Sequence, residues 1–143
     1  MDRLNRPLKT VLDLALARTL VLRAVDQPLG HHHGISLSDL ALLLELRAAP
    51  GEKLRRVELA NKLGVTPSGI ARQVAPLERI GLVGRESNPR DARLALVTLT
   101  EAGHRIADEA QRTAQEAADA ALRAIWGQDE REQLAGLLKA VRG

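Results

Sequence analysis

Residues 56–97 contain the pattern that most constrains the fold of this chain. Arg56–Leu82 holds two short stretches of helical apolar spacing, and Gly64 between them permits a tight turn. Arg85 to Val97, thirteen residues that begin shortly after this segment, predict two short strands joined by a polar, basic loop. A helix pair followed directly by such a loop is the layout of a winged helix-turn-helix, which sets one helix in the DNA major groove and the loop over a neighbouring minor groove.

The distribution of charge agrees with this layout better than the total charge of +3 does. Residues 52–100 hold nine basic and five acidic side chains, whereas residues 101–143 hold six basic and eight acidic ones. A phosphate backbone attracts the first segment and repels the second. We therefore expect the C-terminal part to face away from a nucleic acid.

The composition excludes several other classes of function. The chain has no Cys, which rules out disulfides, thiolate metal sites and cysteine-based redox sensing. It has no Phe or Tyr and one Trp, which argues against the stacking grip used on single-stranded nucleic acids. No stretch reaches about 18 apolar residues and no leader pattern opens the chain. We expect a soluble, cytoplasmic protein with no membrane partner.

The predicted fold is mainly α with a small β wing, a winged helix-turn-helix with helical dimerisation arms. Residues 1–50 are expected to form a dimerisation arm and a support helix, residues 51–100 the DNA-binding lobe, and residues 101–143 the C-terminal dimerisation helices. The caps and breakers predict these elements: a helix from Asn5 to near Asp26, a loop through Pro28 and His31–His33, a helix Leu37–Ala48 capped by Ser36 and Asp39, a strand Lys53–Arg55, helices Val57–Leu63 and Pro67 to before Gly81, strands Gly84–Glu86 and Leu94–Leu99, a helix from the Thr98–Glu101 box to Trp126 with Gly127 closing it, and a last helix from the Asp129–Glu132 box.

The second helix of the pair has one apolar face and one polar face. Ile70, Val74 and Leu77 fall on the side expected to pack, and Ser68, Arg72 and Arg79 on the opposite side. The fork of Arg72 can bind guanine O6 and N7, worth roughly 1–3 kcal/mol of discrimination. The alternative is an ordinary solvated helix face. The candidate DNA contacts on this helix are Thr66, Ser68 and Gly69, whose hydroxyls and first-turn amides suit a phosphate, together with Arg72 and Gln73, the latter for adenine or phosphate.

Pro76 falls within the same helix and removes one backbone hydrogen bond. It predicts a bend, which is either a tolerated kink or a curve that follows the groove.

The predicted loop tip carries an Asp two residues before an Arg. Asp91 can hold Arg93 in a fixed direction, and a fixed Arg suits a narrow minor groove, where the potential is most negative. Arg85 and Arg90 are the expected phosphate contacts of the wing. The alternative is a surface ion pair between Asp91 and Arg93, which would contribute little.

Residues 87–103 (SNPRDARLALVTLTEAG) resemble the wing signature of the MarR family of bacterial transcription regulators. The matching positions are Asp91, Arg93, Leu99, Thr100 and Gly103. The resemblance implies a homodimer whose first, fifth and sixth helices form the platform, with the fourth helix and the wing on DNA. It also implies a repressor released by a small, often anionic aromatic effector bound between platform and DNA lobe, for which Trp126 is the one ring able to stack.

The apolar residues near both ends independently indicate dimerisation, because a lone winged helix has too little surface to bury them. A two-fold dimer would read a pseudo-palindromic operator with half-sites about 34–36 Å apart. The candidate dimerisation residues are Leu8, Val11, Leu12, Leu134, Leu137, Leu138 and Val141.

Three alternatives stay open beside the effector-released repressor. One is a constitutive winged-helix module that binds DNA or protein without an effector. Another is a zinc-responsive regulator using His31–His33, with His104, Asp26 or a glutamate as a further ligand, although adjacent loop residues rarely converge on a metal and we expect a solvent-exposed loop with no metal and no cofactor. The third is an enzyme, which we do not expect, because Ser68 has no predicted base beside it and no glycine-rich phosphate loop is present.

Overall fold

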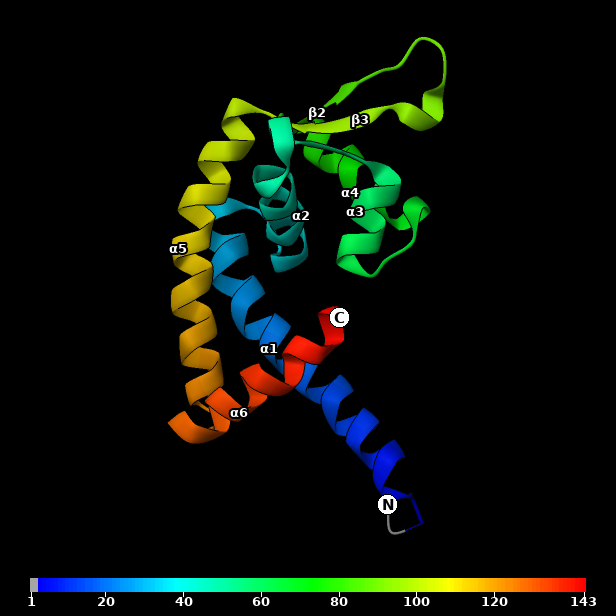
Figure 1. Cartoon of the computed structure of the whole chain (residues 1–143). Helices are drawn as coiled ribbons and strands as arrows, with labels where there is room; N and C mark the ends of the chain where they lie inside the picture. The colour runs from blue at the N-terminus through cyan, green and yellow to red at the C-terminus, as the bar shows by residue number, and fades with distance from the viewer. Residues whose placement is uncertain (1–2) are drawn as a thin grey trace.

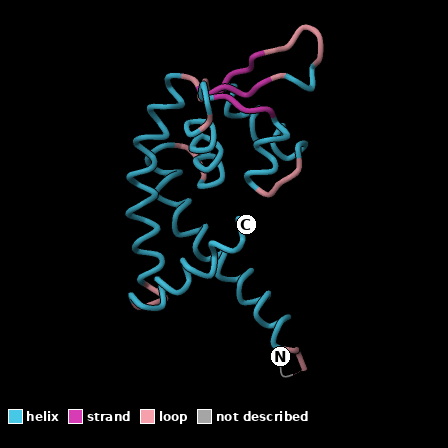
Figure 2. Tube along the Cα trace, in the orientation of Figure 1, coloured by secondary structure: helices cyan, strands magenta, loops and turns pink. Residues whose placement is uncertain are grey.

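The computed structural model describes residues 3–143 as a mainly helical molecule with one small sheet (Figures 1 and 2). This confirms the predicted fold class. The elements, in chain order, are α1 (Arg6–His33), α2 (Leu37–Ala48), a 3-10 turn (Pro50–Glu52), β1 (Lys53–Arg55), α3 (Arg56–Leu63), α4 (Pro67–Arg79), β2 (Val83–Glu86), a 3-10 turn (Ala92–Leu94), β3 (Leu96–Leu99), α5 (Glu101–Arg123), α6 (Gln128–Leu138) and a final 3-10 turn (Lys139–Arg142).

Helix α1 is longer than the sequence predicts, and the expected loop through Pro28 and the histidines is wrong. The helix continues through Pro28 to His33. A proline inside a helix costs about 3 kcal/mol, but Val25 and Leu29 on either side of it are fully buried in the core. Gly34, in the left-handed conformation with φ 70°, ends the helix and donates its N–H to the Gly30 carbonyl.

The three strands form an antiparallel sheet in the order β1-β3-β2. Val97 of β3 lies between Leu54 of β1 and Arg85 of β2. The predicted strand Lys53–Arg55 is confirmed. The second wing strand begins at Leu96 rather than at Leu94, because residues 92–94 form a 3-10 turn instead. We call β1, α3, α4, β2 and β3 together the winged lobe.

Helix α4 begins and packs as its sequence predicts. Thr66 caps it by accepting the Gly69 N–H through Oγ1 (3.0 Å), and Pro67 occupies the first position. Ile70, Val74 and Leu77 are buried. The helix passes through Pro76 without ending.

Helix α5 runs alongside α1 (Figure 1), and its small residues Ala107, Ala110 and Ala114 are buried in the core. The N-cap of α5 is Thr100 and not the predicted Thr98. Thr98 remains in β3, paired with Lys53 and Gly84, so Thr100 caps the helix by accepting the Gly103 N–H (2.9 Å).

The C-terminal helices also differ from their predicted bounds. Helix α5 ends at Arg123, three residues before Trp126. The predicted Asp129–Glu132 box is wrong as the start of the last helix: Gly127 precedes α6 and donates its N–H to Glu130 Oε1 (3.1 Å). Within residues 3–143 no helix combines the length and apolar character needed to cross a bilayer.

Candidate nucleic-acid interface

Helix α4 and the wing lie beside each other and are joined by an ion pair. The wing, formed by β2, β3 and their loop, extends from the end of the molecule that carries α3 and α4 (Figure 1). Arg85 of β2 donates from Nε to Glu78 Oε2 of α4 across 2.8 Å. The sequence does not reveal this contact, because its partners belong to different elements.

The polar face of α4 is open to solvent. Thr66, Ser68 and Arg72 are exposed and Gly69 is half-buried. The hydroxyls of Thr66 and Ser68 are 3.2 Å apart. Arg72 has no ion-pair partner within the described residues 3–143. Its guanidinium is therefore available to an external ligand.

Gln73 is positioned differently from its neighbours on α4. Its side chain is half-buried, and Nε2 donates to Asp39 Oδ1 of α2 across 3.2 Å. Asp39 also completes the capping box of α2 by accepting the Ser36 N–H (3.1 Å). The local sequence indicates only the capping role of Asp39 and does not reveal its contact with α4. A DNA role for Gln73 stays a prediction.

The predicted pair at the wing tip is present. Asp91 Oδ1 accepts the Arg93 backbone N–H (2.9 Å) and its Nε–H (3.2 Å), and Oδ2 accepts from Nη2 (3.2 Å). These bonds, those of the side chain first, lower the pKa of Asp91. The Arg93 side chain is nevertheless 91% exposed. It is held in direction while remaining accessible.

The other predicted wing cations differ in their pairing. Arg85 is engaged by Glu78, as described above. Arg90 is exposed, and its backbone N–H binds Asn88 Oδ1 (2.9 Å). The Arg90 side chain is thus the less constrained of the two.

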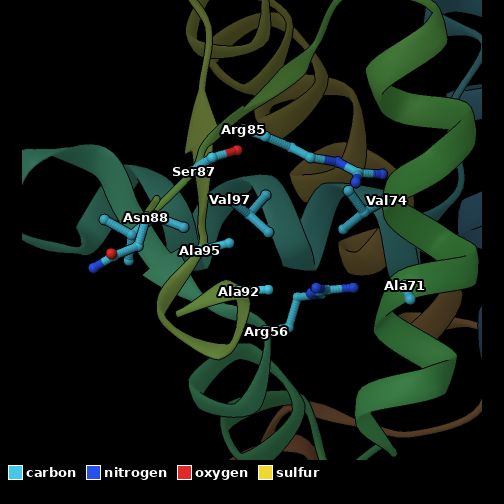
Figure 3. Close-up of a pocket in the computed structure, with 10 residues that line it drawn as sticks. Arg56, Ala71, Val74, Arg85, Ser87, Asn88, Ala92, Ala95 and Val97 are labelled. Atoms are coloured by element: carbon cyan, nitrogen blue, oxygen red, sulfur yellow. The ribbon is translucent and has the colours of Figure 1, made fainter. Parts of the chain in front are cut away.

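A cavity of about 190 Å3 lies between α4, the wing and the start of α3 (Figure 3). Arg56 and Arg85 both line it. Sequence reasoning missed Arg56, although the adjacent Arg55–Arg56 pair gave a signal. Arg55 binds Glu58 Oε1 through its backbone N–H (3.0 Å) and its Nε (3.1 Å), which lowers the pKa of Glu58, whereas Arg56 is exposed.

The residues predicted to dimerise lie on open apolar surfaces of α1 and of the C-terminal helices. A second cavity of about 440 Å3, lined almost entirely by apolar atoms, runs between α1, α5 and α6 and includes Trp126. Leu134 is half-buried in its wall; Leu8, Val11, Leu12, Leu137, Leu138 and Val141 are all exposed.

The three adjacent histidines form the last turn of α1. His31 and His32 are exposed, and His33 Nε2 lies 2.7 Å from Thr113 Oγ1 of α5. Asp26, a suggested additional ligand, instead accepts the Leu37 N–H (2.7 Å). In the part of the chain that the structure describes, no three His, Asp or Glu side chains gather in a way that could hold a metal ion.

Comparison with protein families connects this geometry to known regulators. The family model described as MarR family matches residues 33–94. Among curated proteins, the uncharacterized HTH-type transcriptional regulator YdgJ of Bacillus subtilis (strain 168) is 36% identical over 70 residues, 49% of this chain. That match covers 42% of YdgJ, so the chain aligns with less than half of this relative.

Solved structures match over much more of the chain. Sco3205, a MarR family transcriptional regulator from Streptomyces coelicolor in complex with DNA, is 27% identical with a TM-score of 0.82, over 96% of this chain and 87% of that one. A cysteine-to-serine mutant of MarR from E. coli, complexed with operator DNA, is 26% identical with a TM-score of 0.79, over 96% and 95% of the two chains.

Proposed function

We propose that this chain is a winged-helix transcription regulator of the MarR family, that it binds double-stranded DNA in a sequence-specific way and that it regulates transcription; the family-model match over residues 33–94 and the similar solved regulators support this. One observation carries the proposal. The exposed cationic face of α4, with the free guanidinium of Arg72, lies beside a wing whose Arg93 is oriented by Asp91. An exposed cationic helix face suits the major groove, and an oriented arginine beside it suits the adjacent minor groove of the same duplex.

In this proposal α4 enters the major groove and the wing lies over the neighbouring minor groove. Arg72 discriminates bases, Gln73 contributes at the flank, and Arg93 enters the narrow groove. Phosphate contacts come from the first turn of α4 and from the wing. They are made by Thr66, Ser68, Gly69, Arg85 and Arg90.

We further propose a homodimer that binds a pseudo-palindromic operator. Leu8, Val11 and Leu12 are 43–59% exposed, and Leu137 and Val141 are 74% and 81% exposed. So many large apolar side chains on adjoining helices favour a second copy as their cover. Residues 51–100 then bind DNA, while residues 1–50 and 101–143 supply the dimer platform and the support helix. Such a function needs access to chromosomal DNA, which the expected cytoplasmic location provides.

Repression is the simplest consequence of such binding, because an occupied operator excludes the transcription machinery. Release by a small effector is the mode that the family resemblance implies. A zinc-responsive mode has weaker support, since His33 is engaged by Thr113 and Asp26 by the start of α2. A constitutive module is the remaining alternative, and it predicts equal binding to any duplex.

Selection of bound fragments from a genomic DNA pool tests the proposal. We expect a two-fold symmetric site with half-sites about one helical turn apart. Arg93→Ala should weaken its binding at least tenfold while size-exclusion chromatography still shows a dimer. Arg72→Ala should relax the preference at one or two bases of each half-site. Equal affinity for operator and random duplex would refute sequence-specific regulation and favour the constitutive module.

A further inference from the structure

The cavity between α4 and the wing occupies a particular place in the proposed complex. Its walls are Ala71 and Val74 of α4 on one side and the wing residues Ser87, Asn88 and Ala92 on the other (Figure 3). When a helix occupies the major groove and a wing the adjacent minor groove, the DNA strand that separates the two grooves crosses between them. In the proposed complex we therefore expect a backbone phosphate to pass close to this cavity.

The chemistry of the lining suits an anion. Arg56 and Arg85 both extend toward α4 in Figure 3, and the lining includes the polar residues Ser87 and Asn88 but no carboxylate. Guanidinium forks also match the geometry of phosphate oxygens.

The size of the cavity argues against a whole organic effector as its occupant. At about 190 Å3 it is smaller than the roughly 300–1,000 Å3 typical of pockets for drug-sized ligands. A single phosphate group needs far less room, and it can remain attached to a polymer that stays outside.

Among the residues that the structure describes, the local charges leave Arg56 as the unpaired cation at this cavity. Glu78 already pairs with Arg85 at 2.8 Å, so that guanidinium is largely neutralised. Arg55, the neighbour of Arg56, pairs with Glu58 at 3.1 Å. Within residues 3–143 Arg56 itself takes part in no ion pair. One positive charge thus remains for a ligand.

We propose that Arg56 and Arg85 form a seat for the DNA phosphate that lies between the two grooves, with Glu78 limiting its strength. This inference rests on the proposed function and adds two residues to it: Arg56 at the start of α3 as a phosphate contact, and Glu78 as the carboxylate that competes with DNA for Arg85. The seat contributes affinity without sequence preference, because every phosphate is alike.

Operator titrations at several salt concentrations test the seat. We expect Arg56→Ala to weaken operator and random duplex by the same factor, about fivefold near 0.15 M salt, and to reduce the slope of log K against log salt by about one. Arg56→Lys should restore most of the slope. Arg112→Ala, an equal change of charge at an exposed position of α5 outside the cavity, should change neither quantity.

Glu78→Gln is the opposite variant. It frees Arg85 without removing a cation, so we expect tighter binding to every duplex and a steeper salt slope. A separate readout, the thermal melting of each variant without DNA, shows whether the fold is intact. An Arg56→Ala protein with normal melting and an unchanged slope would overturn the seat.

Two further outcomes separate the possible failures. If the wild-type protein binds no duplex, the proposed function fails and the seat fails with it. If operator binding is normal and independent of Arg56, while inorganic phosphate raises the melting temperature of the wild type but not of Arg56→Ala, the cavity binds a free anion. That outcome would overturn the proposal that the occupant of the cavity is a DNA phosphate.

Discussion

His104 Nδ1 lies 2.8 Å from Glu52 Oε1, and this contact joins α5 to the residue directly before β1. His104 Nε2 also lies 3.5 Å from Asp108, which pairs with Arg47 of α2. The group therefore connects α2, α5 and the 3-10 turn that leads into β1. These contacts form a polar joint between the start of the winged lobe and α5, the helix that leads to the apolar surfaces.

Replacing His104 by Ala should loosen this joint. The side chains of His104 and Glu52 are 44% and 39% exposed, so we expect a loss of only about 0.5–1 kcal/mol in the free energy of unfolding. Urea unfolding measures it. His31→Ala, at an exposed position, is the matched control. A loss several times larger would mean that the joint is far stronger than its exposure indicates.

Gly103 should tolerate no side chain. A Cβ there would lie 2.0 Å from the Leu82 carbonyl oxygen and 2.8 Å from Leu99 Cδ1. We expect Gly103→Ala to reduce the free energy of unfolding by about 2–3 kcal/mol through overpacking. The control is Gly136→Ala in α6, where nothing lies within 4 Å of the new Cβ. We expect this variant to raise the free energy of unfolding by up to about 1 kcal/mol. Equal melting temperatures for the two variants would contradict the close contact.

The pH dependence of DNA binding should reflect the Asp91–Arg93 pair. Because the folded pKa of Asp91 is lowered, the pair is intact above the ordinary Asp pKa of about 4 and is lost only as the pH falls through the lowered value. Binding that depends on Arg93, measured as the ratio of wild type to Arg93→Ala, should therefore be constant from about pH 5 to 8. A decline of this ratio within that interval would show that another group controls the wing.

The apolar groove, which is the cavity between α1, α5 and α6, contains a direct probe of dimerisation. Trp126 is the single tryptophan of the chain and lines the groove with Leu14 and Leu138. Leu14→Glu should convert dimer to monomer and shift Trp126 emission to longer wavelength, because the indole becomes hydrated. Sedimentation equilibrium measures the mass in parallel. A monomeric wild type, or an unaffected variant, would remove the groove from the proposed interface.

Local signals predicted much of the fold. The Ser36–Asp39 box and the Thr66 cap lie next to the amides that they bind, so the sequence alone places them. The end of α1 depended instead on the burial of Val25 and Leu29, which favours a helix through Pro28. The choice between Thr98 and Thr100 as a cap was likewise decided by strand pairing.

The site was predictable to the same degree and for the same reason. Asp91 and Arg93 are two residues apart, and their contact follows from the loop sequence. The contacts of Gln73 with Asp39, and of Arg85 with Glu78, join residues of separate elements. No local pattern encodes them, because they exist only after the helices and the sheet have packed.

The unbroken course of α1 has a mechanical consequence. Its 28 residues extend for about 42 Å as one continuous helix, from the open apolar surface to Val25 and Leu29 in the core of the molecule. Since no loop interrupts α1, a movement of one end of the helix is passed on to the other. In a dimer, a tilt of α1 at the shared end would therefore move both winged lobes. The distance between their two α4 helices would change, and with it their fit to the helical repeat of the duplex.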